Sequence, residues 1–242
     1  MRHPIFLSII IPAYNEELRL GRTLPVLRTW LEKQEYVWEV VLVDAGSSDR
    51  TLEIFHEVFP PEQGRSFKNE FNRGKGYAIR RGIREAQGEV LLFSDADFST
   101  PIEEFPKLAG YLQSGYDIAI GSRSLPESNV EVHQAWYREG MGKIFNLLVR
   151  MIVLRGFIDT QCGFKCVRRE CVLPLLPKMA VDGFCYDVEF LFLAKKAGLK
   201  IKEVPVTWVN DPVSKVHVLI DSSKMFLDLL WIRFRDGFGQ YD

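Results

Sequence analysis

Cysteine is scarce in this chain, and its spacing argues against a zinc site. The four cysteines among 242 residues form no Cys-x-x-Cys pair, and the four histidines do not cluster beside them. Structural zinc sites usually take their ligands from such closely spaced pairs. We therefore expect the cysteines to be reduced and buried.

The chain also lacks an excess of charge and any long apolar run. Its 31 basic and 32 acidic residues leave a net charge of −1, whereas nucleic-acid binders normally carry a basic excess. The sequence contains no run of roughly 18 uninterrupted apolar residues, which is the length that a membrane-spanning helix needs. Residues 1–4 lead directly into a strand-like segment without a signal-peptide pattern. We expect a cytoplasmic protein with no nucleic-acid partner.

Strand-like and helix-like segments alternate through the first half. We expect strands at 7–11, 37–43, 67–71, 88–93 and 117–120, and helices at 16–33, 49–59, 74–86 and 101–113. Apolar strands separated by helices predict a parallel sheet that is covered on both faces. Beyond a polar, loop-like stretch at 122–137, we expect helices at 138–155, 186–196 and 224–235 and strands at 164–167 and 201–208.

Two carboxylates follow the apolar strand that ends at residue 93. Asp95 and Asp97 are one residue apart, and side chains at i and i+2 of an extended segment point the same way. Converging carboxylates repel each other unless a cation lies between them, and hard divalent cations take oxygen ligands. The pair predicts a metal site at the edge of the sheet, and an Asp-rich turn without a ligand is the alternative.

Five short motifs together resemble the inverting, nucleotide-sugar-dependent glycosyltransferases of family GT2. They lie at 8–16, 43–51, 72–78, 94–97 and 121–123, each at the end of an expected strand or next to one. The resemblance covers nearly the whole chain. It implies the α/β GT-A fold, which is Rossmann-like, with a mostly parallel central sheet and helices on both faces. A C-terminal amphipathic helix is expected in addition.

The resemblance also implies a donor site. The residues that it places around the base and ribose are Pro12, Tyr14, Glu16 and Asp44. Lys75 is a further candidate near the nucleotide, and Ala45 stands where the family often has a second Asp. Asp95 and Asp97 would meet Mg²⁺ or Mn²⁺ on the diphosphate, where the metal neutralises the leaving group.

The second half looks like the enzymes that glycosylate a polyprenyl phosphate. Segments 159–165, 184–189 and 214–216 are most similar to dolichyl-phosphate glucosyltransferases and more distantly to dolichyl-phosphate mannose synthases. The resemblance implies a UDP-glucose or GDP-mannose donor. A lipid phosphate is already anionic, so positioning and charge compensation should dominate catalysis. The candidate phosphate contacts are Arg123, which is also a catalytic candidate, Arg138 and Lys215. Gln161 and Lys165 are expected to shape the donor or acceptor pocket, with Gln161 a candidate donor contact.

Asp187 occupies the position where many family members keep a catalytic base. If the acceptor is a soluble sugar or polysaccharide, its hydroxyl needs that base. If the acceptor is a lipid phosphate, a structural or positioning role for Asp187 is favoured.

The helices expected at 138–155 and 224–235 combine apolar and basic side chains. Such helices can lie in the interface of a bilayer, and packing into the core is the alternative. We expect a peripheral protein on the inner face of the membrane, held by these helices or by a membrane-protein partner. Residues 1–210 form the glycosyltransferase domain, with a nucleotide-binding half at 1–121 and an acceptor-side half at 122–210. Residues 211–242 form the C-terminal extension.

Two other functional classes remain open. A sugar-nucleotide nucleotidyltransferase would also use a parallel sheet and acidic metal ligands, but it should carry a Gly-rich loop where this chain has Pro-Ala-Tyr-Asn-Glu at 12–16. A catalytically silent nucleotide-binding or membrane-docking module would not need the carboxylates and cations that this chain retains.

Overall fold

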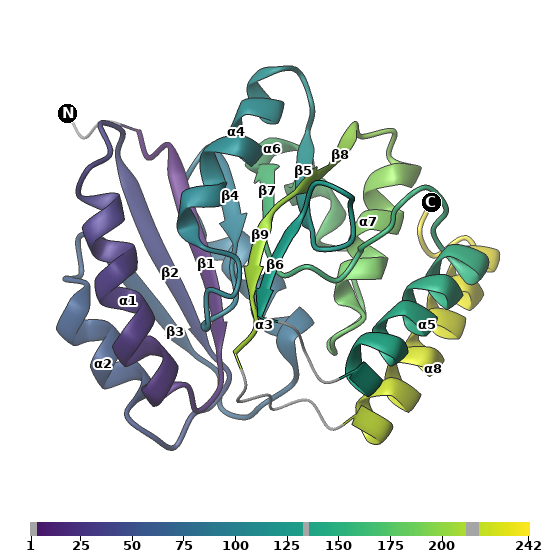
Figure 1. Cartoon of the computed structure of the whole chain (residues 1–242), viewed down its shortest axis with the longest axis horizontal. Coiled ribbons are helices and arrows are strands. Elements are labelled where there is room, and N and C mark those ends of the chain that lie inside the picture. The colour runs from purple at the N-terminus through teal and green to yellow at the C-terminus, as the bar shows by residue number, and fades with distance from the viewer. Residues whose placement is uncertain (1–3, 133–135, 212–217) are drawn as a thin grey trace.

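A seven-stranded sheet forms the centre of the molecule (Figure 1). The computed structural model describes residues 4–132, 136–211 and 218–242. The strands lie in the order β3-β2-β1-β4-β7-β5-β8. Their bounds are β1 Leu7–Ala13, β2 Trp38–Asp44, β3 Gly64–Lys68, β4 Val90–Phe93, β5 Ile118–Ser122, β7 Lys165–Arg168 and β8 Ile201–Pro205. This arrangement confirms the predicted α/β class with a mostly parallel sheet.

One strand runs against the others. β7 pairs antiparallel with β4 on one side and with β5 on the other, with Lys165 opposite Phe93. All other neighbours in the large sheet are parallel. The apolar pattern of residues 164–167 predicted this strand but carried no information on its direction.

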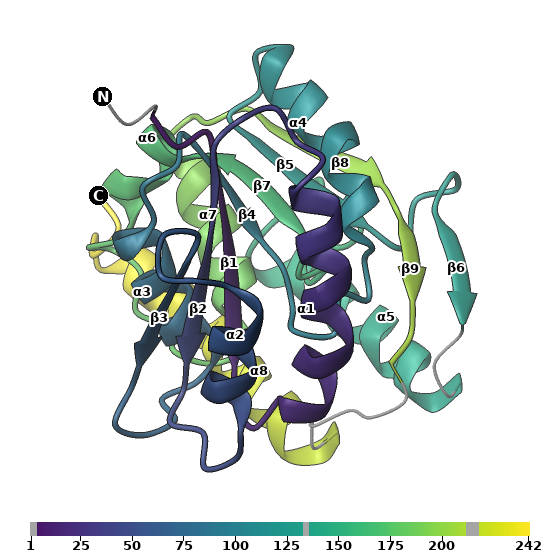
Figure 2. The ribbon, with the colours of Figure 1, turned by 90° about the vertical axis from the view of Figure 1, so that its left-hand side faces the viewer.

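A second, two-stranded sheet corrects two predictions. β6 (Asn129–Val132) pairs in parallel with β9 (Thr207–Val209), and Figure 2 shows these strands at the side of the molecule. The stretch 122–137, predicted as a loop, therefore contains a strand and the start of a helix. The single strand predicted at 201–208 is divided into β8 and β9 at Val206, whose N–H donates to the Ser122 carbonyl of β5 while its own carbonyl accepts from the Asn129 N–H of β6.

Helices cover both faces of the large sheet. One face carries α1 Glu17–Leu31, α2 Thr51–Val58, η1 Ile102–Glu104 and α4 Phe105–Gln113. The other carries α3 Lys75–Glu85, α5 Trp136–Ile152, α6 Arg169–Val172, η2 Leu173–Leu175, α7 Tyr186–Lys196 and α8 Val218–Gly237. β1 shows how one strand supplies both cores, because Ile10 packs on the second face while Ile9 and Ile11 pack on the first. Complete burial of such a side chain stabilises the fold by about 1.5–3 kcal/mol.

α5 and α8 lie side by side at one end of the molecule, on the right in Figure 1. Each has an inner side, where Val149, Leu229 and Ile232 are buried. Each also has an outer side on which large apolar residues stay exposed, namely Ile144, Leu147, Met151, Phe226, Leu227, Leu230, Trp231, Phe234 and Phe238. Among the described residues, neither helix is apolar and long enough to cross a bilayer.

The four cysteines are free thiols, as predicted. Cys162, Cys166 and Cys185 are buried, whereas Cys171 is half-buried. Burial raises the pKa of the Cys171 thiol to about 11, so this cysteine stays protonated at neutral pH. The division of the chain at residue 210 stays a prediction.

Candidate active site

Asp95 and Lys75 form the central ion pair of the predicted site. Asp95 lies two residues after β4, and its Oδ1 is 2.5 Å from the Nζ of Lys75, the first residue of α3. Burial alone would raise the pKa of the Asp95 carboxyl, but the positive charges of Lys75, Lys165 and Arg123 together lower it. Burial acts against the charge of Lys75 as well, yet Asp95 and the neighbouring acids raise its pKa. Both groups are therefore charged.

Asp97 lies beside this pair and has no basic partner at ion-pair distance among the described residues. Its Oδ1 accepts a hydrogen bond of 3.0 Å from the backbone N–H of Ser99. Burial and the negative charge of Asp95 raise the pKa of the Asp97 carboxyl. The next residue, Phe98, has a φ of 46°, so the chain turns sharply away from the strand. A cation placed here would relieve the repulsion between the two carboxylates.

The surroundings of the two carboxylates fit a divalent metal. A cavity of about 20 Å³ is lined by both aspartates together with Ser94, Ser99, Gly163 and Trp208, and that space suffices for one water-sized species. The Lys75 ammonium already stands in for a cation at Asp95. The described part of the chain contains no group of three or more His, Cys, Asp or Glu side chains suited to a metal. Two carboxylates would leave coordination positions for phosphate oxygens and water.

Arg123 follows β5 and is held by a buried carboxylate. Its Nε is 2.7 Å from Oδ2 of Asp159, and its Nη2 is 2.9 Å from Oδ1. Asp159 is fully buried, whereas the Arg123 side chain is 29% exposed. Burial would lower the pKa of Arg123, but Asp159 more than compensates and raises it. Three of the five guanidinium N–H groups remain beyond this two-bond contact, so Arg123 can still contact an anion.

Lys165 and Asp187 meet beneath the site. The Nζ of Lys165 donates to Asp187 Oδ1 and to the carbonyl oxygen of Cys162, both at 2.5 Å. Burial raises the pKa of the Asp187 carboxyl, although the Lys165 and Lys75 ammonium groups oppose this shift. The structure thus places the predicted base candidate against a lysine.

Asp44 ends β2 with one satisfied oxygen and one unsatisfied oxygen. Its Oδ1 accepts from the backbone N–H of Ser47 at 2.9 Å and from the Ser47 hydroxyl at 2.5 Å. Its buried Oδ2 has no hydrogen-bond partner within the described residues. An unsatisfied buried carboxylate oxygen is costly, which is the pattern expected where a ligand supplies the missing donor.

Asn69 lies next to Asp44 and was not predicted. Its backbone N–H donates to the Asp44 carbonyl at 2.8 Å, and its side-chain oxygen accepts from Arg81. The side-chain Nδ2 is buried and has no acceptor in the described part of the chain. The strand predicted at 67–71 is β3, which lies three residues earlier, and the error hid Asn69 inside an expected strand. Had the end of β3 been predicted at Lys68, Asn69 would have been recognised as a polar residue directly after a strand.

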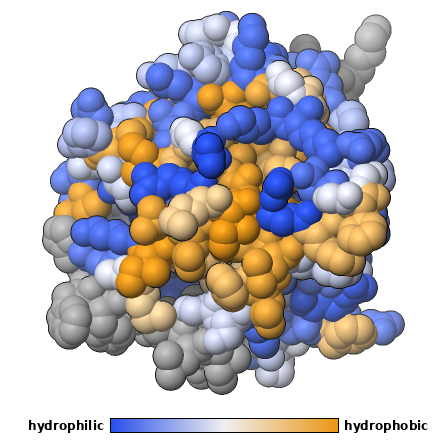
Figure 3. All heavy atoms as spheres, turned by 90° about the vertical axis from the view of Figure 1, so that its right-hand side faces the viewer, coloured by the Kyte–Doolittle hydropathy of each residue, from blue (hydrophilic) through white to orange (hydrophobic). Residues whose placement is uncertain are grey.

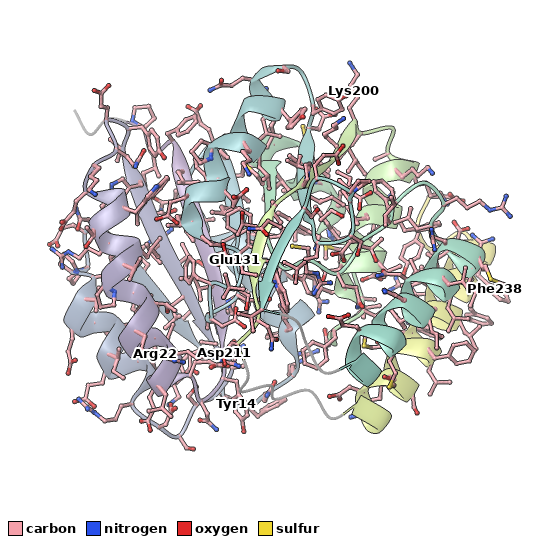
Figure 4. All side chains as sticks on the ribbon, viewed as in Figure 1. Tyr14, Arg22, Glu131, Lys200, Asp211 and Phe238 are labelled. Atoms are coloured by element: carbon pink, nitrogen blue, oxygen red, sulfur yellow. The ribbon has the colours of Figure 1, made fainter. Side chains whose placement is uncertain are left out.

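The remaining donor candidates lie at the same edge of the sheet. Pro12 is in β1, and Tyr14 follows that strand with 40% of its surface exposed. Glu16 pairs at 3.1 Å with Arg19. Arg19 in turn pairs with Asp211 at 3.1 Å, and this link between distant segments was not predicted. Figure 4 shows Tyr14, Arg22 and Asp211 together at this edge.

Three predicted residues are less closely defined. The backbone N–H of Gln161 donates to Asp159 Oδ1 at 3.1 Å, within the segment that supports Arg123. Arg138 belongs to the first turns of α5, but its side chain lies outside the described portion. Lys215 lies outside the described residues altogether. The roles of these residues stay predictions.

Comparisons with known proteins show the family to which this chain belongs. The model of glycosyl transferase family 2 matches residues 8–172. A dolichyl-phosphate beta-glucosyltransferase of Saccharomyces cerevisiae is 36% identical over 256 residues, which cover 98% of this chain and 77% of the relative. The protein of the same name from Homo sapiens is 33% identical, over 95% of this chain and 75% of the relative.

Solved structures share the fold at lower identity. Glucosyl-3-phosphoglycerate synthase of Mycobacterium tuberculosis, in complex with Mn²⁺, UDP and glucosyl-3-phosphoglycerate, has a TM-score of 0.69 at 16% identity, covering 95% of this chain and 80% of that one. Mannosyl-3-phosphoglycerate synthase of Rubrobacter xylanophilus has a TM-score of 0.71 at 20% identity, covering 98% and 75%. The predicted GT2 resemblance is thereby confirmed: this chain belongs to glycosyl transferase family 2.

Proposed function

We propose that this protein is an inverting, metal-dependent glucosyltransferase that transfers glucose from UDP-glucose to a polyprenyl phosphate such as dolichyl phosphate. The observation that carries the proposal is the convergence of Asp95, Lys75 and Arg123 at one edge of the sheet. Relatives that are 32–36% identical and named dolichyl-phosphate beta-glucosyltransferase support the acceptor class and the sugar.

Two buried atoms support a donor base with an N–H next to a carbonyl. Asp44 Oδ2 is an acceptor without a donor, and Asn69 Nδ2 is a donor without an acceptor, within the described residues. The N3–H and a neighbouring carbonyl of uracil complement this pair, whereas the N3 and amino group of cytosine present the reverse polarity. Guanine has a similar edge, so GDP-mannose stays the alternative donor. Both atoms are buried in this structure, so a base reaches them only after a local movement.

Asp95 and Asp97 would hold Mg²⁺ or Mn²⁺ on the donor diphosphate. A divalent ion there would neutralise the charge that develops on the departing UDP. Lys75 and Arg123 add positive charge to the same edge and orient the phosphates. A structural neighbour solved with Mn²⁺, UDP-glucose and phosphoglyceric acid, with a TM-score of 0.68, supports a metal in this fold.

The acceptor phosphate needs no general base. An anionic phosphate oxygen forms the new bond to the anomeric carbon of glucose, while the bond from that carbon to the UDP oxygen breaks and its electron pair leaves with UDP. No proton has to move. Arg123 would position the acceptor phosphate through its remaining N–H groups, and Arg138 and Lys215 are proposed to assist. Asp187 would act structurally, because Lys165 occupies its Oδ1.

The outer side of α5 and α8 would dock on the cytoplasmic face of the membrane, where the lipid acceptor lies. Figure 3 shows a broad apolar area on this face with polar side chains around it. Among the described side chains of the two helices, the exposed charged ones are all basic (Lys143, Arg150, Lys224 and Arg233), whereas the acidic ones, Glu139, Asp221, Asp228 and Asp236, are half-buried. Anionic head groups attract such cations. This chemistry fits a lipid surface better than a membrane-protein partner, which remains the alternative.

A panel of UDP- and GDP-sugars tests the proposal. Each radiolabelled donor is incubated with Mn²⁺ or Mg²⁺, with and without a short polyprenyl phosphate, and label is counted in the organic phase. We expect lipid product with UDP-glucose, and a loss on the order of 100-fold in Asp97→Asn. Glu57→Gln, on the exposed side of α2, is the control that keeps activity. Release of UDP only with a soluble saccharide acceptor would refute the lipid assignment.

A further inference from the structure

Lys75 is the resident counter-ion of Asp95. Its ammonium lies 2.5 Å from Oδ1, and its side chain is 19% exposed, against 39% for that of Asp95. The same oxygen is one that a divalent metal would need. An ammonium group and a divalent cation cannot share it at contact distance, because they repel each other strongly in a partly buried site.

The opposite side of the Asp95 carboxylate is closed by backbone. A Cβ at Gly163 would lie 2.3 Å from Asp95 Oδ2, so only glycine allows the chain to approach so closely. The carboxylate is therefore packed between Gly163 and Lys75. The backbone at Gly163 therefore limits the rotation of this carboxylate on the side away from Lys75.

The backbone of Lys75 is fixed by its neighbours. Gly74 has a φ of 118°, and a Cβ there would lie 2.3 Å from the carbonyl oxygen of Asp182. A Cβ at Gly76 would lie 2.4 Å from the carbonyl oxygen of Val181. Arg80, one turn further along α3, is bound to the Asp182 carboxylate. The start of α3 is thus held against the segment before α7, and the flexible Lys75 side chain is the part that can leave Asp95.

We propose that Lys75 keeps divalent metal off Asp95 until the diphosphate of the donor arrives and draws the ammonium away. The inference rests on the proposed function, because the diphosphate is that of the nucleotide sugar. The metal then binds together with the donor rather than before it, and the free enzyme carries a lysine in place of a metal charge. Lys75 is in this sense a positioning residue that couples metal binding to donor binding.

The test measures Mn²⁺ binding to the full chain without any sugar or acceptor. Free Mn²⁺ is followed by electron paramagnetic resonance in wild type, Lys75→Gln and Lys107→Gln. Lys107 is the matched control, because its ammonium also lies 2.5 Å from a carboxylate, that of Glu104, and its side chain is 53% exposed. Without nucleotide, we expect Lys75→Gln to bind Mn²⁺ about tenfold more tightly than wild type, and Lys107→Gln to match wild type.

A second arm adds UDP. By linkage, UDP should tighten Mn²⁺ binding more in wild type than in Lys75→Gln, because the variant has no ammonium to displace. Thermal unfolding checks that the variants fold, and Lys75→Ala replaces the glutamine variant if that one does not. Equal Mn²⁺ affinity in wild type and variant, weaker binding in the variant, or no binding in either overturns the inference. These readouts are independent of lipid product, so failure of the glucosyl-transfer assay leaves them interpretable.

Discussion

The ammonium of Lys165 and the carboxylate of Asp187 form an ion pair closed to solvent, with side chains 0% and 3% exposed. Removing one partner of such a pair leaves a buried charge and costs about 3–5 kcal/mol. We expect Lys165→Met to lower the free energy of unfolding by that amount in urea titrations. Lys33→Met, at an exposed position, should change it by less than about 0.5 kcal/mol. A Lys165→Met protein as stable as wild type would contradict the buried pair.

The Asp187→Asn variant distinguishes a structural role of the Asp187 carboxylate from a role as catalytic base. Because Lys165 occupies Oδ1 and a lipid phosphate needs no deprotonation, we expect kcat to fall by about tenfold or less. Loss of a general base would cost on the order of 10²–10⁴. The measurement is kcat for polyprenyl phosphate at saturating donor, with a pH profile. A loss in the larger range, together with disappearance of an acid limb from that profile, would identify a base.

Asn69 is expected to read the donor base. Asn69→Leu removes the unsatisfied Nδ2 donor, so UDP should bind about tenfold more weakly in calorimetry. The ratio between the affinities for UDP and CDP should also become smaller. Asp44→Asn is the companion variant, because an amide in place of the carboxylate can donate to N3 of cytosine and should favour CDP further. Unchanged UDP affinity in Asn69→Leu would remove Asn69 from the donor site.

Trp231 and Phe234 stack on the outer side of α8, with ring centroids 5.6 Å apart. If this side enters the bilayer, replacing both with serine should weaken binding to phosphatidylglycerol-containing vesicles by at least about tenfold. Activity towards a short, soluble polyprenyl phosphate should persist. Leu18→Ser is the control, since Leu18 is 77% exposed on α1. Co-sedimentation gives the binding, and equal sedimentation of all three proteins would exclude this surface as the docking site.

Asp228 on α8 should make stability depend on pH. Burial, with a further effect of Glu189, raises its pKa to about 6, above the model-peptide value of about 3.9. The folded state therefore keeps the proton longer than the unfolded state, so this group's contribution to stability is full below about pH 4. It falls between about pH 4 and 6 and stays low above that range.

Asp228→Asn should remove this decline. Because the group is only half-buried, solvent screening limits the gain to about 1 kcal/mol at pH 8, with none near pH 4. Urea unfolding of both proteins across this range gives the difference. A difference that does not change with pH would show that the carboxyl does not titrate differently in the folded and unfolded states.

Local pattern was sufficient to predict the parts of the site that follow apolar strands. Asp44 ends one such run, Asp95 and Asp97 follow another after a short turn, and the structure places all three at the same edge of the sheet. The direction of β7 could not be predicted, because period and composition do not depend on strand direction. The link from Arg19 to Asp211 joins residues 192 positions apart, and only tertiary packing determines such a pair.

Residues with mixed patterns were placed less accurately. β3 begins with Gly64, Arg65 and Ser66, whereas Phe67 near its end and Phe71 after it are apolar, so apolar content shifted the predicted strand towards the C-terminus. β6 has the sequence Asn-Val-Glu-Val and is largely exposed, so no apolar run marked it as a strand. Its strand geometry comes from pairing with β9, a partner that lies far along the chain.

The reversed direction of β7 has a consequence for redesign of the enzyme. The parallel strands have their C-terminal ends at the edge of the sheet that carries the site. β7 has its N-terminal end there, since Lys165 lies opposite Phe93. The segment that leads into β7, residues 159–165, therefore makes three contacts with the site: Asp159 pairs with Arg123, Gly163 lies against Asp95, and Lys165 pairs with Asp187. These three contacts depend on one segment, so a change in its backbone alters all of them together. Exchanging residues 159–165 between relatives as one cassette should preserve their fit, whereas piecemeal changes in this loop would break it.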